Sequence, residues 1–125
     1  MLEHRRAFSG FSVDSIAAAH DFYSGQLGLE VQELDNGLLR LHLADDYEVI
    51  VYPKHDHTPA VFTILNFSVE DIERAVDELS AAGVETIRYQ GFPQDERGIS
   101  RNPGGPPIAW FNDPAGNVLA VLEDG

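Results

Sequence analysis

The chain has 125 residues, 43% apolar content, no cysteine and a formal net charge of −13. This length is one domain's worth of material, and without cysteine the chain has no disulfide, thiolate zinc site or cysteine nucleophile. The acidic charge argues against nucleic acid as a partner, and the lack of an apolar run of about 20 residues argues against a membrane span, so we expect a cytoplasmic protein.

The sequence pattern of the first half of the chain predicts a strand, a helix and then three more strands. An apolar run beginning at Phe8 leads to Ser15, a residue type that caps helix N-termini, and to a helix-period pattern that closes at Gly28. The strands expected next are 29–34 and 38–43, joined as a hairpin by an Asn-Gly turn, and 47–52. This first module covers about 7–53, and a polar linker at 54–60 follows it.

The second half, about 61–123, repeats the same order. A shift of 56 positions sets Phe11 on Phe67, Ser12 on Ser68, Val13 on Val69 and Ile16 on Ile72, which indicates a duplication. The expected elements are a strand at 61–69, a helix at 71–82 capped by Asp71, and strands at 84–89, 108–111 and 118–123. Because strand side chains alternate between faces, the apolar face of 61–69 should pack on the helix and leave Asn66 and Ser68 on the opposite face.

Three motifs carry a resemblance to a known family: Phe22-Tyr23 late in the first helix, Leu27-Gly28-Leu29 after it, and Asp113-Pro114-Ala115-Gly116-Asn117 before the last strand. With the duplicated element order, they resemble the vicinal oxygen chelate superfamily, which includes glyoxalase I, bleomycin-resistance proteins, fosfomycin-resistance enzymes and extradiol dioxygenases. The resemblance implies an α+β fold in which two βαβββ modules form curved mixed sheets around a central cleft, with the helices outside. It also implies a homodimer, since open sheet edges can be covered by a partner.

Enzymes of this superfamily commonly hold a divalent metal through His, Gln or Glu side chains on the first and last strand of each module. The matching positions here are Phe8, the segment from Val49 to Val51, Ile64 and Ala120, none of which offers a donor atom. Glu48 is the closest carboxylate, but strand alternation puts it on the opposite face from Val49 and Val51. Because the sequence departs from the family's ligand pattern at these positions, we expect a protein without a metal or other cofactor, whose cleft binds a small molecule.

The residues expected to bind a ligand lie on the strand faces turned away from the helices or near the rim of the cleft. They are Phe8, Ser12, Arg40, His42, Tyr52, Ile64, Asn66, Ser68, Tyr89, Trp110 and Ala120. Arg40 and His42 are the candidates for catalysis, because they are two apart on one strand and could anchor an anion and exchange a proton. The sequence places no carboxylate beside His42, so a purely hydrogen-bonding role stays open.

Two further features leave alternatives open. His55 and His57 could ligate a metal with a third donor, or could simply lie in a solvated linker. The loop 91–107, with four Gly and four Pro residues, could be a lid that brings Phe92, Ile99, Arg97 and Arg101 to the ligand, or could cover a sheet edge or contact a second subunit.

The sequence leaves three hypotheses about function. The first is a metal-free protein that binds a small aromatic ligand, with cationic drug-like molecules as one class, through cation–π contacts to Tyr52, Tyr89 or Trp110. The second is an enzyme, either a lyase or isomerase of the glyoxalase type that uses Arg40 and His42, or a dioxygenase-type enzyme with an unorthodox metal site. The third is an interaction module without a small ligand.

Overall fold

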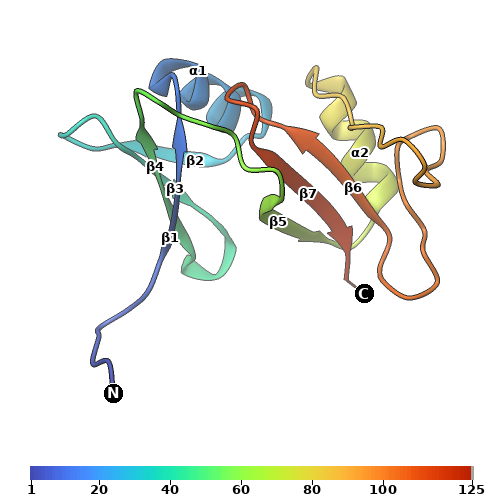
Figure 1. Cartoon of the computed structure of the whole chain (residues 1–125), viewed down its shortest axis with the longest axis horizontal. Coiled ribbons are helices and arrows are strands. Elements are labelled where there is room, and N and C mark those ends of the chain that lie inside the picture. The colour runs from blue at the N-terminus through green and yellow to red at the C-terminus, as the bar shows by residue number, and fades with distance from the viewer. Residues whose placement is uncertain (125) are drawn as a thin grey trace. The chain divides into compact units, whose positions relative to one another are not determined.

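The computed structural model describes residues 1–124, and the chain divides into two compact units between Thr58 and Pro59. The division falls within the segment 54–60 that the sequence presents as a linker. In the described residues each unit combines a mixed β-sheet with an α-helix (Figure 1), which confirms the predicted α+β class. None of the helices in residues 1–124 has the length and apolarity needed to cross a membrane.

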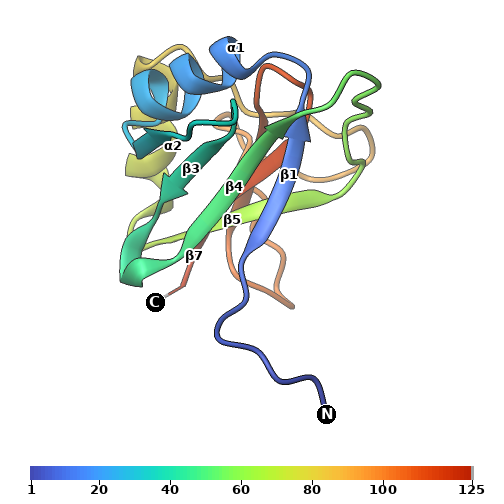
Figure 2. The same ribbon diagram turned by 90° about the vertical axis from the view of Figure 1, so that its left-hand side faces the viewer.

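The sheet of the first unit has four strands in the order β1-β4-β3-β2. Figure 2 shows β1, β4 and β3 side by side. The strands are β1 (Ser9–Val13), β2 (Glu30–Glu33), β3 (Leu39–His42) and β4 (Glu48–Pro53). β1 runs parallel to β4 and the other pairs are antiparallel, so the predicted hairpin between β2 and β3 is confirmed. In register across β1, β4 and β3, Phe11, Val51 and Leu39 are all buried and form the core face of this sheet.

The first helix begins as predicted but changes its winding. The Ser15 hydroxyl accepts a hydrogen bond from the Ala18 backbone N–H at 3.2 Å and caps α1 (Ile16–His20). From Asp21–Gln26 the chain is π-helical, with Phe22 and Tyr23 buried. The Tyr23 ring lies 5.8 Å from that of Phe11, so this helical segment packs on the core face of the sheet and leaves the opposite face without a helix.

The second unit has a three-stranded sheet in the order β5-β7-β6. It comprises β5 (Thr63–Val69), β6 (Ile108–Asn112) and β7 (Val118–Glu123), with β5 parallel to β7 and β6 antiparallel to it. Helix α2 (Ile72–Ala81) buries Ile72 and Val76 against β7 and β6, and the Asp71 carboxylate caps it by accepting from the Arg74 N–H at 3.1 Å. Asn66 and Ser68 are exposed on the other face, as the alternation predicts.

The strand expected at 84–89 is wrong. This segment makes an isolated bridge between Thr86 and Phe111, and the Ile87 N–H donates to the Trp110 carbonyl at 2.8 Å. Beyond that point the Gln94 side chain takes the backbone groups a ladder would use, because its Oε1 accepts from the Tyr89 N–H and its Nε2 donates to the Ile87 carbonyl. A side chain from the following loop therefore replaces the neighbouring strand.

Candidate functional site

The helix-free face of the first sheet carries a polar cluster of Gln32, Arg40, His42 and Glu48. Strand pairing sets Arg40 opposite Gln32 on β2 and sets His42 opposite Glu48 on β4. The Gln32 Oε1 atom accepts from Arg40 Nη1 at 3.2 Å and lies 2.9 Å from His42 Nε2. One amide oxygen therefore holds both residues that the sequence presents as candidates for catalysis.

Glu48 supplies the carboxylate that the sequence did not place beside this pair. Its Oε2 lies 3.1 Å from Arg40 Nε and 3.3 Å from Arg6 Nη1, so one carboxylate serves two guanidinium groups. Arg40 Nε is buried and makes no hydrogen bond within the described residues, so its contact with Glu48 is an ion pair without hydrogen-bond direction. A second carboxylate, Glu30 Oε2, lies 3.9 Å from His42 Nε2.

The positions matched to the family's metal ligands do not fit a divalent metal. Val49 and Val51 are buried on the core face, which leaves Glu48 and Ile50 on the helix-free face. Phe8 is 57% exposed beneath the Arg6 guanidinium, and Ala120 is fully buried. A cation of this kind needs several oxygen or nitrogen donors, and the Glu48 carboxylate beside Val49 is already paired with two arginines.

The histidines of the linker do not gather a metal site either. His55 is exposed, whereas the Nδ1 atom of His57 lies 2.6 Å from the Ser12 hydroxyl oxygen on β1. Residues 1–124 contain no group of three or more His, Asp or Glu side chains placed to hold a metal ion.

The helix-free face of the second sheet carries an aromatic cluster of Tyr89, Phe92 and Trp110. The Trp110 ring centroid lies 5.3 Å from that of Tyr89 and 5.5 Å from that of Phe92, with edge-to-face angles of 81° and 83°. Tyr89 is 40% exposed and Phe92 is 41% exposed, so the cluster presents aromatic surface to solvent. The sequence presented Phe92 only as apolar surface on the loop. Its signal was that it follows Tyr89 after the two residues Gln90 and Gly91.

The remaining predicted ligand residues divide between the two units. In the first unit Ser12 faces Tyr52 across β1 and β4, and Tyr52 is 39% exposed. In the second unit the register places Asn66, Ala120 and Trp110 in one row across β5, β7 and β6. Ile64 is half-buried at the start of β5.

The structure directs Arg97 and Arg101 to helix α2 and buries Ile99, which does not favour the alternative in which these residues cover a ligand. Arg97 Nε donates to Asp77 on α2 at 3.0 Å, and Arg101 Nη2 donates to Glu73 on the same helix at 2.9 Å. By accepting this hydrogen bond Asp77 raises the pKa of Arg97, and Ile99 is only 1% exposed. The segment 94–101 is therefore fixed to the helix side of the unit, and Phe92 reaches the aromatic cluster.

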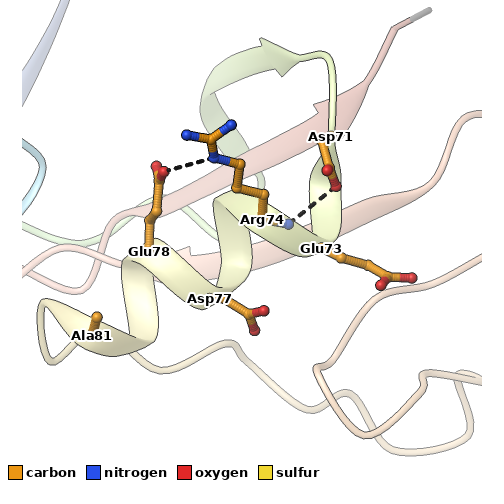
Figure 3. A pocket seen from close by; sticks show the side chains of 6 residues that line it. All are labelled: Asp71, Glu73, Arg74, Asp77, Glu78 and Ala81. Atoms are coloured by element: carbon orange, nitrogen blue, oxygen red, sulfur yellow. Dashed lines mark hydrogen bonds and ion pairs between the residues drawn. The ribbon is translucent and has the colours of Figure 1, made fainter.

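A groove also runs along the exposed side of α2 (Figure 3). It is lined by Asp71, Glu73, Arg74, Asp77, Glu78 and Ala81. Arg74 Nε donates to Glu78 at 3.3 Å, and Asp71 is occupied by its cap, while Glu73 and Asp77 hold the loop arginines. The charged side chains of this groove therefore stabilise helix α2 or bind the loop arginines, and none of them is a residue that the sequence predicts to bind a ligand.

The chain matches a family model and several solved structures. The family model described as the Glyoxalase/Bleomycin resistance protein/Dioxygenase superfamily matches residues 7–121. No curated protein matches the chain at a significant level.

Solved structures share the fold at low identity. The fosfomycin resistance protein FosX from Listeria monocytogenes superposes with a TM-score of 0.73 at 11% identity, covering 99% of this chain and 96% of that one. A lactoylglutathione lyase from Agrobacterium tumefaciens gives 0.69 at 19% identity, covering 97% and 94%. TnmS3, described as an antibiotic binding protein from a Streptomyces species, gives 0.67 at 20% identity, covering 99% and 100%.

Proposed function

Because the chain belongs to the glyoxalase/bleomycin resistance protein/dioxygenase superfamily, we propose that it is a member that binds a small aromatic molecule without a metal ion. The observation that carries this proposal is the aromatic cluster of Tyr89, Phe92 and Trp110 on the helix-free face of the second sheet. Large aromatic side chains left about 40% exposed beside one another offer faces and edges that a planar ligand can stack against. The description of TnmS3 as antibiotic-binding supports the view that this fold can serve as a binding module.

A cationic aromatic ligand suits the chain best. Each well-placed aromatic contact adds about 0.5–1.5 kcal/mol beyond burial, and each cation–π contact adds about 0.5–2 kcal/mol. The net charge of −13 raises the local concentration of cations and so favours the same class.

The test uses Trp110, the only tryptophan, as its own reporter. Tryptophan fluorescence is followed while planar aromatic cations, and neutral molecules of matched shape, are titrated into the protein. Tyr89→Leu and Phe92→Leu keep apolar bulk but remove a ring, so each should weaken binding about 2–13-fold, which corresponds to the loss of one aromatic contact of about 0.5–1.5 kcal/mol. Tyr47→Leu is the matched control, since Tyr47 is 70% exposed and lies in the first unit.

Two results would contradict this assignment of the binding surface. One is a ligand from the panel that binds the parent and both cluster variants equally well. The other is a Tyr47→Leu variant that loses as much affinity as the cluster variants.

The metal-free part of the proposal rests on donor chemistry at Phe8, Ile64 and Ala120, whose side chains have no lone pair to give. Protein treated with EDTA should therefore bind the same ligand with the same affinity. Elemental analysis that finds one equivalent of zinc, nickel, iron or manganese resisting removal would contradict it.

A second candidate function is a metal-independent lyase or isomerase, and the polar cluster favours it. The Gln32 amide oxygen contacts both His42 and Arg40, and Glu48 forms an ion pair with Arg40. Because one structural neighbour is a lactoylglutathione lyase, the first assay is formation of lactoylglutathione from methylglyoxal and glutathione. EDTA-treated parent protein should be active and His42→Gln inactive; equal rates for parent, variant and buffer would exclude this reaction.

Assembly as a homodimer belongs to the same proposal. The edge strand β2 pairs only with β3 among the described residues, so its outer backbone groups can be covered by a second copy. Light scattering at tens of micromolar should give twice the 13.8 kDa chain mass, and a monomer mass there would refute the dimer.

A further inference from the structure

A serine and a histidine meet on the helix-free face of the first sheet, outside the aromatic and polar clusters. The Ser12 hydroxyl oxygen on β1 lies 2.6 Å from His57 Nδ1, although the two residues are 45 positions apart in the chain. Both side chains are half-buried, so they are held by the fold and still reachable from solvent. The distance is at the short end of the range for a hydroxyl–imidazole hydrogen bond.

The backbone around His57 is anchored to the strand that carries Ser12. The Lys54 N–H donates to the Val13 carbonyl at 2.9 Å, which extends the pairing of β1 with β4 by one residue. The His57 N–H then donates to the Lys54 carbonyl at 3.1 Å and closes a turn, and an ion pair between Lys54 and Asp56 braces it. The imidazole is therefore presented to Ser12 by a fixed turn.

Gly10 and Tyr52 flank Ser12 on the helix-free face of the sheet. Gly10 lies two residues before Ser12 on the same face of β1 and carries no side chain there. Tyr52 faces Ser12 from β4 and is 39% exposed, so it forms one wall beside the hydroxyl.

We propose that Ser12 is a nucleophile activated by His57 and that it reacts with activated acyl and phosphoryl esters. A serine hydroxyl attacks such groups when a neighbouring base takes its proton during the attack. Here the Ser12 oxygen forms a bond to the carbonyl carbon or phosphorus, its proton passes to His57 Nδ1, and the bond to the leaving alcohol or fluoride breaks. His57 gives the proton to the leaving group, and with acyl esters water then releases the acid and restores Ser12.

The first measurement is intact-mass spectrometry after incubation with a fluorophosphonate probe. One adduct per chain should form, and peptide mapping should place it on Ser12. Ser12→Ala should abolish it, and His57→Gln should slow it by at least about 100-fold, the usual contribution of a general base. p-Nitrophenyl acetate should give a burst of p-nitrophenol in the parent and none in Ser12→Ala.

The chain offers matched controls for both residues. Ser9→Ala changes another serine of β1, and His55→Gln changes another histidine of the same turn, so both should label like the parent. Circular dichroism of every variant separates loss of folding from loss of the nucleophile. The proposal is overturned if the parent forms no adduct, if the adduct maps elsewhere, or if folded His57→Gln reacts as fast as the parent.

Discussion

Replacing Gly98 with alanine should show whether the 91–107 loop is a fixed part of the second unit. Gly98 has a φ of +85°, and a Cβ added there would lie 2.2 Å from the Thr86 hydroxyl oxygen and 2.8 Å from its Cβ. Thr86 cannot move freely, because its hydroxyl donates to the Arg97 carbonyl at 2.8 Å. Gly91 is the matched position, since it has a φ of +76° and nothing within 4 Å of an added Cβ.

The two alanine variants separate backbone strain from collision. Both carry the cost of a left-handed non-glycine residue, about 1–2 kcal/mol. Gly98→Ala also breaks the Thr86 hydrogen bond, at about 1 kcal/mol, and overpacks a buried contact, at about 1–3 kcal/mol. The free energy of unfolding should therefore be about 2–4 kcal/mol lower for Gly98→Ala than for Gly91→Ala.

Urea unfolding followed by Trp110 fluorescence measures this difference. With a urea slope of about 1–3 kcal/mol/M, the Gly98→Ala midpoint should lie about 0.7–4 M below that of Gly91→Ala. Adding Thr86→Ala to Gly98→Ala should recover part of the loss, because the atom nearest to the new Cβ is then gone. Equal midpoints for Gly98→Ala and Gly91→Ala would refute a fixed loop, because a mobile loop would absorb the collision.

Three further outcomes are expected. Asp113→Ala should lower the free energy of unfolding by about 2–4 kcal/mol in urea, since the buried carboxylate accepts three hydrogen bonds in the turn before β7; a loss under about 0.5 kcal/mol would contradict this. The hydrogen bond from Lys54 lowers the pKa of Asp56. The stabilisation that this pair gives the fold is therefore complete above the ordinary aspartate pKa and is lost as pH falls through the lowered pKa. An NMR titration of Asp56 should show a low midpoint that Lys54→Met raises, and an unchanged midpoint in that variant would refute Lys54 as the cause. Glu48→Gln should cost under about 1 kcal/mol, and less in high salt, because its ion pair with Arg40 is partly exposed and screened; a larger, salt-independent loss would show a stronger pair.

The sequence predicted most of the elements because their signals are local. The Asp71 cap, the apolar stripe of α2 and the alternation in β5 each follow from residues a few positions apart, and all are confirmed. The residue pattern at 84–89 is compatible with a strand. The prediction of a strand there failed because the Gln94 side chain makes the hydrogen bonds to the Tyr89 N–H and the Ile87 carbonyl that a neighbouring strand would make. No local pattern reveals such competition.

The candidate sites were predicted in part. Alternation along one strand placed Arg40 and His42 on the same face. Gln32 and Glu48 were missed as their partners because that contact depends on the register between β2, β3 and β4, which two hairpin turns set together. The meeting of Ser12 with His57 had no signal in either segment.

By itself the sequence indicated a duplication and determined the α+β class, the order of the helices and of every strand except the one expected at 84–89, and the lack of donor atoms at Phe8, Ile64 and Ala120. These properties depend on side-chain chemistry and on periods of two and 3.6 residues, which can be read along the chain. The tertiary structure decided which polar groups share a hydrogen bond, that Arg97 and Arg101 bind helix carboxylates, and that Phe92 joins Trp110. Those contacts join residues far apart in the chain, and strand register and core packing fix them only when each unit folds as a whole.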